Sequence, residues 1–309
     1  MSDVIVQNIS KSYNKGSVQA LSDITFSVKK GELFGLVGPD GAGKTTLFRI
    51  LTTLLLADQG KASVNNSDVV IDYKAIRRKV GYMPGKFSLY QDLTVEENLN
   101  FFAAIFNTTV KDNYDLIKDI YVQLEPFKTR RAGKLSGGMK QKLALCCALI
   151  HRPAVLFLDE PTTGVDTVSR KEFWDMLKRL KKEGITILVS TPYMDEANLC
   201  ERIALIQKGK ILSIDTPQQI IKEYPDKLYA IKSDQMSALL KELRNNDLIK
   251  SAFSFGEYHH ISFTENHSGN PLNPSFLSGK YDGNIEIKNI EPTVEDCFIH
   301  LMSKQEVYG

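Results

Sequence analysis

The sequence predicts an α/β protein with a mixed, largely parallel sheet, a helical insert and a small C-terminal α+β appendage. Short β-branched runs alternate with amphipathic stretches, as in proteins built from strand–helix–strand units. A purely helical pattern interrupts this alternation from Thr94 to about Ile150. Past about Tyr224 the chain becomes rich in turns, with short alternating runs. We therefore predict a main domain at 1–224, with a helical subdomain at about 90–150, and an accessory domain at 225–309.

The first part of the main domain contains three strand-like runs. They are "VIVQNI" (4–9), "ITFSV" (24–28) and "LFGLVG" (33–38). A helix is expected to follow from Gly43 through about Leu55. Another strand, "VGYM", is predicted at 80–83.

The helical insert opens at a recognisable start signal. Thr94 is followed three residues later by Glu97, which is the pattern of a capping box. The stretches "NYDLIKDIYVQL" and "GGMKQKLALCCALI" continue at helical period. After the insert, strands are predicted at "AVLFLD" (154–159) and "ITILVS" (185–190), separated by the helix "RKEFWDMLKRLKKEG" and followed by the strands "RIALIQ" and "KILSI".

Composition excludes several classes of function. The formal net charge of +2 gives no electrostatic reason to expect nucleic acid as a partner. The cysteines lack C-x-x-C spacing, so we expect buried free thiols in a reducing compartment; they are Cys146, Cys147, Cys200 and Cys297. The start of the chain has no apolar signal region, and no apolar run is long enough to span a bilayer. A cytosolic chain is expected, and any membrane spanning would fall to another subunit.

The clearest chemical motif is "GPDGAGKT" at 38–45. It fits the P-loop pattern G-x-x-x-x-G-K-[ST], between a strand and a helix. Backbone N–H groups of such a loop surround nucleotide phosphates, and the helix N-terminus adds partial positive charge. Lys44 would reach the β- and γ-phosphates, and Thr45 would bind Mg²⁺. The predicted nucleotide-binding set is Gly38, Pro39, Asp40, Gly41, Ala42, Gly43, Lys44, Thr45 and Thr46.

A second motif, "AVLFLDEP" at 154–161, supplies acidic groups. A buried strand places Asp159 at its end, where the carboxylate can bind Mg²⁺, and Glu160 can polarise an attacking water. An apolar run before Asp-Glu is by itself a weak signal, because a strand can simply meet an acidic turn. Together with the P-loop it predicts an ATPase that uses Mg²⁺, with Glu160 and Lys44 as catalytic residues.

The stretch "LSGGMKQKLALCCAL" identifies a family. It resembles the LSGGQ signature of the ATPase subunits of ABC transporters, with Met139 in place of Gln, and the resemblance covers about residues 4–220. In that family the positions of Ser136, Gly137 and Gly138 hold the γ-phosphate of ATP bound to the opposite subunit. The resemblance therefore implies a P-loop NTPase fold and a head-to-tail dimer with a second ATPase domain, either identical or different.

Other positions match the same family. Tyr13 corresponds to the aromatic residue that stacks on adenine, with Val18 nearby, and Asp166 lies in the segment "TTGVD" that resembles the D-loop at the dimer seam. Asp40 stands where the family often has Asn. The segments "IEPTVEDCFIHLM" (290–302) and "GYMPGKFSLYQDLTVEENLNFFA" are similar to the ABC-2-type, multidrug-exporter branch. This similarity implies separate transmembrane permease subunits and a location on the inner face of the cell membrane.

Two positions depart from the family pattern. Gly85 stands where the Q-loop carries Gln, and Pro192 stands where the H-loop carries His. Neither side chain can donate a hydrogen bond, and losing one transition-state donor typically costs about 10²–10³ in rate. One interpretation is tolerated drift, with Glu160 sustaining turnover. The other is a pocket that binds ATP but hydrolyses it poorly while Ser136 completes a partner's site. Two rival functions also stay open, namely a nucleotide-switched binding module and a soluble ABC ATPase without a transport role.

Overall fold

The computed structural model describes residues 1–265, 269–277 and 285–308. Residues 266–268, 278–284 and 309 of the predicted accessory domain lie outside the described residues. The chain divides into two compact units. Unit 1 comprises Met1–Ile220 together with Leu301–Gly309, and unit 2 comprises Ile221–His300.

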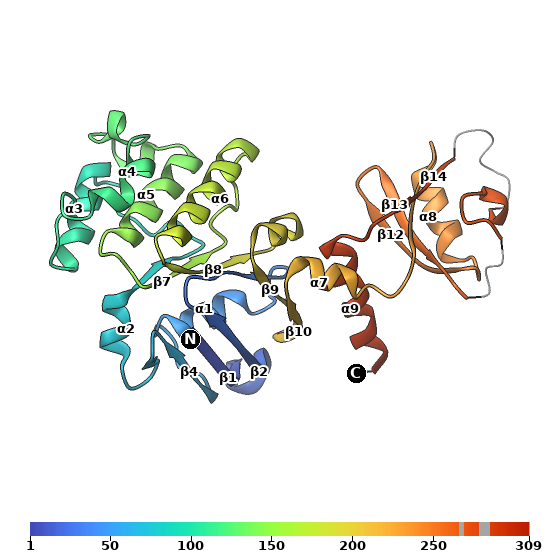
Figure 1. Ribbon diagram of the computed structural model, residues 1–309, viewed down its shortest axis with the longest axis horizontal. Coiled ribbons are helices and arrows are strands. Elements are labelled where there is room, and N and C mark those ends of the chain that lie inside the picture. Colours follow the sequence, from blue (N-terminus) through green and yellow to red (C-terminus); the bar gives the residue numbers. More distant parts are fainter. Residues whose placement is uncertain (266–268, 278–284, 309) are drawn as a thin grey trace. The chain divides into compact units, whose positions relative to one another are not determined.

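Unit 1 contains two sheets (Figure 1). The central sheet has the strand order β10-β9-β3-β8-β7-β6 and is parallel from β9 to β6, whereas β10 is antiparallel to β9. Its strands are β3 (Leu33–Val37), β6 (Val80–Met83), β7 (Val155–Asp159), β8 (Thr186–Thr191), β9 (Arg202–Gln207) and β10 (Lys210–Asp215). The second sheet is antiparallel, with the order β2-β1-β4-β5. Its strands are β1 (Ser2–Tyr13), β2 (Val18–Lys29), β4 (Gln59–Val64) and β5 (Ser67–Asp68).

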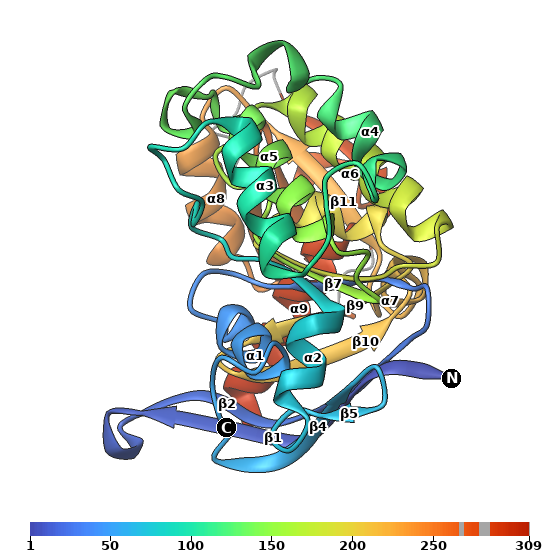
Figure 2. The ribbon, with the colours of Figure 1, turned by 90° about the vertical axis from the view of Figure 1, so that its left-hand side faces the viewer.

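Helix α1 (Lys44–Leu51) lies between these two sheets, since it contacts β7 of one and β2 and β4 of the other (Figure 2). A second group of helices gathers at the β6–β8 side of the central sheet, as Figure 1 shows. It consists of α3 (Val95–Ile105), α4 (Tyr114–Tyr121), α5 (Gly137–Leu149) and α6 (Thr167–Lys182). The shorter helices of unit 1 are α2 (Tyr73–Lys79) and α7 (Pro217–Lys222), the latter reaching two residues into unit 2. The core between the sheets is aliphatic and aromatic, with Phe34, Phe48 and Phe157 among its fully buried side chains.

The fold confirms the predicted α/β class with a mixed, largely parallel sheet. The capping box at Thr94 is present, because its hydroxyl accepts from the Glu97 amide and the Glu97 carboxylate accepts from the Thr94 amide. The helix predicted from Gly43 to about Leu55 is too long. It ends at Leu51 because Thr53 adopts a left-handed conformation (φ 64°), which cannot continue an α-helix. The antiparallel strands β4 and β5 and helix α2 were not predicted.

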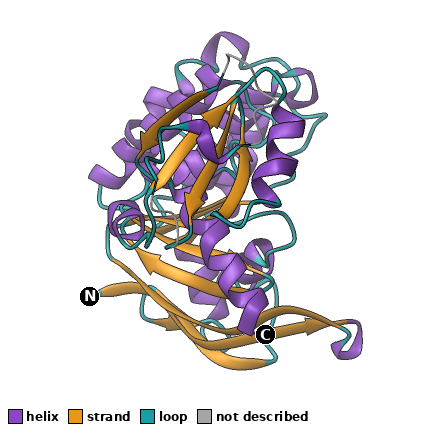
Figure 3. Ribbon diagram, turned by 90° about the vertical axis from the view of Figure 1, so that its right-hand side faces the viewer, coloured by secondary structure: helices purple, strands orange, loops and turns teal. Residues whose placement is uncertain are grey.

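Unit 2 is built on one antiparallel sheet with the order β12-β13-β11-β14. Its strands are β11 (Leu228–Lys232), β12 (Ile249–Phe255), β13 (Tyr258–Phe263) and β14 (Glu286–Ile290). Helix α8 (Met236–Arg244) contacts β12 and β13, and in Figure 3, which faces this unit, the strands are orange and the helices purple. A small core includes Ile231, Leu239 and Ile261. Helix α9 (Val294–Tyr308) begins in unit 2, and its last residues group with unit 1.

Within the described residues, none of the helices is both long and apolar enough to cross a membrane. The four cysteines are buried and free, as predicted. Burial raises the pKa of the thiols of Cys146, Cys147 and Cys200 well above their usual value.

Candidate nucleotide-binding site

Three parallel strands end at one edge of the central sheet. Val37 at the end of β3 is paired with Thr191 at the end of β8, and Asp159 at the end of β7 is paired with Ser190. Because the carboxyl ends of parallel strands meet at the same edge, the three following loops meet there too. These loops begin at Gly38, Glu160 and Pro192.

The loop after β3 is held in place by close backbone contacts. Gly43 has a φ of +105°, and a Cβ at this position would lie 2.5 Å from the carbonyl oxygen of Ala20. Gly41 also has a positive φ, and Gly38 donates its amide to the Thr191 carbonyl at 3.1 Å. Only glycine fits such backbone positions without strain. The loop therefore leads directly into the N-terminus of α1, where backbone N–H groups point outward.

Lys44 is the first residue of α1 and is almost fully buried, with 3% of its side chain exposed. Its ammonium donates to the carbonyl oxygens of Gly38 at 2.7 Å and Pro39 at 2.9 Å. It also lies 3.1 Å from Oε1 of Glu160, so the two predicted catalytic residues form an ion pair. A buried cation at a helix N-terminus attracts anions such as phosphate.

The acidic side of the site is equally well positioned. Asp159 is 2% exposed, and its Oδ1 accepts a 2.6 Å hydrogen bond from the Ser190 hydroxyl. Glu160 has a φ of +50°, and its amide donates to the Ser190 carbonyl at 3.1 Å and to the Ser190 hydroxyl at 3.0 Å. This role of Ser190 was not predicted, and its only sequence signal is its place at the end of a predicted strand.

The residues present fit a magnesium ion that arrives with a nucleotide. Mg²⁺ prefers hard oxygen ligands and is commonly held by one or two carboxylates plus substrate phosphates. Asp159 supplies such a carboxylate at the sheet edge, and Thr45 lies in the first turn of α1. In the described part of the chain, no group of three or more His, Cys, Asp or Glu side chains could hold a metal alone. His259 and His260 instead have structural partners, the Met236 carbonyl and the Asp296 carboxylate.

The two departures from the family pattern both lie at this edge. A Cβ at Gly85 would lie 3.1 Å from the carbonyl oxygen of Asp159, so position 85 adjoins the acidic pair. Pro192 directly follows Thr191, whose carbonyl binds the amide of Gly38. Neither Gly85 nor Pro192 brings a side-chain donor to the edge.

The predicted adenine-contacting residues lie on the hairpin formed by β1 and β2. Tyr13 and Val18 are paired across the end of this hairpin, and Val18 is 49% exposed. The Tyr13 hydroxyl lies 3.3 Å from the hydroxyl of Thr46 in α1. The structure therefore brings the aromatic ring and the phosphate loop together from distant parts of the chain.

The signature residues lie in a different part of unit 1. Ser136 is the N-cap of α5, and its hydroxyl accepts from the Met139 amide at 3.3 Å. Helix α5 contacts α3, α4, α6 and β6, whereas α1 contacts the two sheets. Gly137 and Gly138 instead adjoin the start of α6, where a Cβ on Gly138 would lie 3.0 Å from the Ser169 hydroxyl. Asp166 caps that helix, and its carboxylate accepts a hydrogen bond from the Ser169 amide. This hydrogen bond lowers the pKa of the Asp166 carboxyl.

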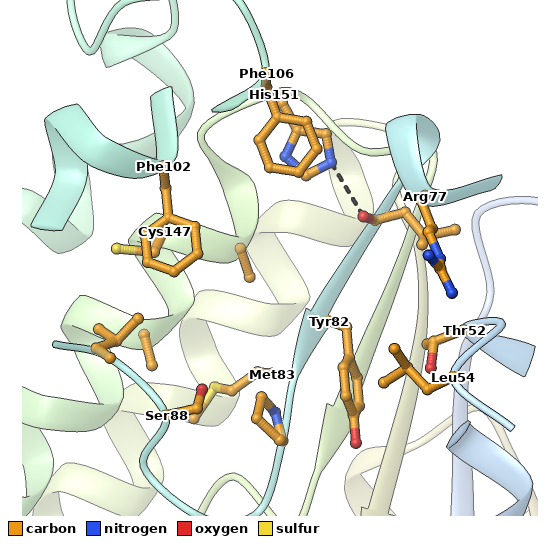
Figure 4. A pocket seen from close by; sticks show the side chains of 15 residues that line it. Thr52, Leu54, Arg77, Tyr82, Met83, Ser88, Phe102, Phe106, Cys147 and His151 are labelled. Carbon is orange, nitrogen blue, oxygen red and sulfur yellow. Dashed lines mark hydrogen bonds between the residues drawn. The ribbon is translucent and has the colours of Figure 1, made fainter. Parts of the chain in front are cut away.

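A mostly apolar pocket of about 310 Å³ lies between β6, α3, α5 and the segment after α1 (Figure 4). Tyr82 and Met83 line it from β6, and Phe102, Phe106 and His151 line it from the helical side. The His151 ring stacks on Phe106 with centroids 3.7 Å apart, and its Nε2 lies 3.1 Å from the Val80 carbonyl. Burial lowers the pKa of His151, which favours the neutral ring.

A glycine-rich loop at a helix N-terminus, a buried lysine and an Asp-Glu pair at the end of another strand of the same sheet together define a P-loop nucleotide-binding protein. Comparison with known proteins specifies the family. The profile described as "ABC transporter" matches residues 21–163. The chain is 36% identical over 227 residues to the Nod factor export ATP-binding protein I of Rhizobium sp. (strain N33), covering 72% of this chain and 75% of that protein. The chain belongs to the ABC transporter family of ATP-binding proteins.

Two further relatives bear on its biology. The chain is 41% identical over 237 residues to the probable multidrug ABC transporter ATP-binding protein YbhF of Escherichia coli (strain K12). That match covers 75% of this chain but only 41% of YbhF. A solved dimeric structure of the ATP-binding cassette MJ0796, in a post-hydrolysis state bound to ADP and Pi, aligns with a TM-score of 0.63 at 26% identity. It covers 69% of this chain and 98% of that one. The resemblance inferred from the signature is confirmed.

Proposed function

We propose that the chain is the ATP-binding subunit of an ABC-2-type export complex, peripheral to the inner face of the membrane. Residues 1–224 would form the ATPase domain and 225–309 an accessory domain. ATP binding and hydrolysis in a dimer of ATPase domains would drive transport through separate membrane subunits. The observation that carries this proposal is the convergence of Lys44, Asp159 and Glu160 at one sheet edge. The names of the relatives, a probable multidrug ABC transporter ATP-binding protein and a Nod factor export ATP-binding protein, supply the transport context.

Each site residue has a chemical role in this proposal. The loop amides from Gly38 to Gly43 and the ammonium of Lys44 would bind the phosphates. Thr45 and Asp159 would hold Mg²⁺, which neutralises phosphate charge when bound. Tyr13, with Val18 beside it, would contact the adenine ring.

The ion pair between Lys44 and Glu160 supports a link between binding and catalysis. The Lys44 ammonium has three hydrogens and three oxygen neighbours, of which Glu160 is the only carboxylate. A phosphate oxygen at Lys44 would replace Glu160 as its anionic partner. The Glu160 carboxylate would then be free to orient a water molecule for attack.

A second ATPase domain is needed to complete the site. The clamp formed by Ser136, Gly137 and Gly138 lies at the N-terminus of α5, which packs against α3, α4, α6 and β6. Its hydroxyl and helix N-terminus are suited to an anion, and they would bind the γ-phosphate of a nucleotide held by the partner domain. The dimeric state of the related cassette supports this arrangement.

The pocket of Figure 4 is the surface that we propose for a membrane subunit. Leu54 lines the pocket and is 57% exposed. Tyr90 (52% exposed) and Ile105 (54%) are the sequence neighbours of the lining residues Leu89 and Phe106. Apolar side chains of this size exposed together on a protein surface often mark an interface. Because Met83 lies two residues before Gly85, motion at this surface would reach the nucleotide site through the same segment.

The pocket of this chain is proposed to hydrolyse ATP slowly. Gly85 and Pro192 lie at the site but contribute no side-chain donor, whereas the groups proposed to bind ATP are all present. The clamp at Ser136 would serve a partner pocket that retains Gln and His. The same observation favours a second candidate function, a nucleotide-switched binding module with little ATPase activity.

Binding and turnover measured together test the proposal. The purified chain should bind Mg-ATP, and Lys44→Ala should weaken that binding strongly because a buried cation is removed. Co-expression with a multi-span permease should carry the chain into the membrane fraction, while Phe106→Asp in the pocket should release it. The proposal is wrong if the chain binds no ATP, or if it stays in the soluble fraction with every permease encoded beside it. Steady-state turnover by the assembled complex would exclude the binding module.

A further inference from the structure

We propose that Glu196 is a positioning residue for ATP hydrolysis. Its side chain connects the loop after β8, in which it lies, to the loop after β7. We call Glu196 and its partners Thr162, Thr191 and Arg170 the Glu196 clamp. The inference rests on the proposed hydrolysis of ATP in this pocket and extends it to side chains to which the motifs assign no role.

The carboxylate of Glu196 is buried at the centre of the clamp. The residue lies in a short 3-10 helix, Met194–Leu199, and is 1% exposed. Its Oε1 accepts a 2.7 Å hydrogen bond from the Thr162 hydroxyl, and its Oε2 accepts a short one from the Thr191 hydroxyl. One carboxylate oxygen is therefore held by the loop after β7, and the other by the last residue of β8, where the loop after β8 begins.

Both loops carry groups of the nucleotide site. Thr162 lies two residues after Glu160, inside a tight turn in which the Thr163 amide donates to the Glu160 carbonyl at 3.2 Å. Thr191 precedes Pro192, and its carbonyl accepts from the Gly38 amide. A displacement of Glu196 would thus move the segment of Glu160 relative to the phosphate loop.

Arg170 extends the clamp to helix α6. Its guanidinium lies 4.2 Å above the Tyr193 ring, and its Nε lies 3.6 Å from Oε1 of Glu196. This Nε is buried, and the described residues offer it no acceptor within hydrogen-bond distance. The Arg170 amide donates to the carbonyl of Asp166 at 2.9 Å, so the clamp also reaches the predicted dimer seam.

The clamp matters for catalysis because Pro192 cannot contact a phosphate through a hydrogen bond. The loop after β8 can then influence the reaction only by where it places its neighbours, and Glu196 fixes that place. Misplacement of reacting groups by about 1 Å can lower a rate by about a hundredfold. A purely structural clamp would lower thermal stability but leave the rate of the folded protein unchanged.

The test compares matched threonine variants. Thr162→Val removes the hydroxyl that binds Glu196, and Thr162→Ser keeps it. Thr109→Val makes the same change at an exposed threonine between α3 and α4, outside the clamp and the nucleotide site. Single-turnover hydrolysis is measured with protein in excess over labelled Mg-ATP, so that slow turnover is still resolved, and ATP affinity and Tm are measured on the same samples.

We expect Thr162→Val to lower the single-turnover rate about tenfold or more, with ATP affinity within about twofold of the unmodified chain, since it does not touch the phosphate loop. Thr162→Ser should recover most of the rate, and Thr109→Val should match the unmodified chain. The clamp is refuted if Thr162→Val hydrolyses ATP as fast as Thr109→Val, or if rate and affinity fall together.

A Glu160→Gln variant separates this failure from failure of the proposed function. If the unmodified chain is no faster than Glu160→Gln, the proposed hydrolysis is wrong and the clamp falls with it. If the unmodified chain hydrolyses ATP faster than Glu160→Gln but Thr162→Val is as fast as the unmodified chain, only the clamp is wrong. Glu196→Gln, which keeps the size of the side chain, should retain more rate than Glu196→Ala, and equal rates would also contradict the proposal.

Discussion

Replacing Pro192 by histidine should speed ATP hydrolysis in this chain's own pocket. Pro192 follows Thr191, whose carbonyl binds the amide of Gly38 at 3.1 Å. The residue that precedes 192 is therefore hydrogen-bonded to the first residue of the phosphate loop. A histidine side chain there has a donor that can reach a bound γ-phosphate, and Pro192 has none.

The structure sets the size of the expected gain. One donor to a developing anion is worth about 10²–10³ in rate, and groups that act together are not additive. Because Gly85 would still lack a side chain, we expect Pro192→His to raise the single-turnover rate by about 10- to 100-fold, or about 1.4–2.7 kcal/mol in activation free energy. Gly85→Gln alone should gain less, since a Cβ at 85 would lie 3.1 Å from the Asp159 carbonyl and push it by a few tenths of an ångström.

The assay is single-turnover hydrolysis of Mg-ATP at saturating protein, with ATP affinity measured in parallel. Pro192→Ala is the matched control, because it removes the proline ring without adding a side-chain donor. Equal rates for Pro192→His and Pro192→Ala would refute the reasoning that a missing donor at this position limits hydrolysis. A gain in affinity without a gain in rate would refute it as well.

Two further predictions concern backbone and pH. Gly43→Ala should lower Tm and weaken ATP binding, because the φ of residue 43 is +105° and the added Cβ would lie 2.5 Å from the Ala20 carbonyl oxygen. Gly41→Ala should lower Tm and ATP affinity less, because nothing lies within 4 Å of the added Cβ. A larger loss in Gly41→Ala than in Gly43→Ala would contradict this geometry. In unit 2, burial raises the pKa of Asp296 but hydrogen bonds from His260 and Thr293 outweigh it, so the net pKa lies below the ordinary value. The stabilising contribution of this carboxylate should be present above about pH 4, the ordinary aspartate value, and be lost as the pH falls through its lower folded value. Acid unfolding followed by circular dichroism should therefore begin at higher pH in Asp296→Asn, if that variant folds, and an unchanged acid profile would show that the carboxylate contributes nothing.

Local patterns were sufficient to predict the nucleotide loop and the strands around it. The P-loop pattern and the apolar run before Asp159 each depend on residues adjacent in the chain. Parallel strands then require their carboxyl ends to share one edge, which brought Lys44 and Glu160 together. The end of α1 was predicted less well, because the left-handed turn at Thr53 has no glycine to mark it.

The Glu196 clamp could not be predicted from local pattern. Thr162 and Glu196 are 34 residues apart, and no sequence motif links the two side chains. Their hydrogen bond depends on how two loops pack after the sheet has formed. A buried glutamate in a short 3-10 helix has no periodic signal, since charged residues there are usually exposed.

The most direct test of the central claim uses the assembled complex with its permease and partner ATPase domain. ATP turnover is compared for two variants of this chain. Glu160→Gln changes its own nucleotide pocket, and Ser136→Arg changes the signature residues at the start of α5. If this chain binds ATP but mainly completes its partner's site, Ser136→Arg should abolish most turnover and Glu160→Gln should leave most of it. Loss of all turnover with Glu160→Gln alone would contradict that claim.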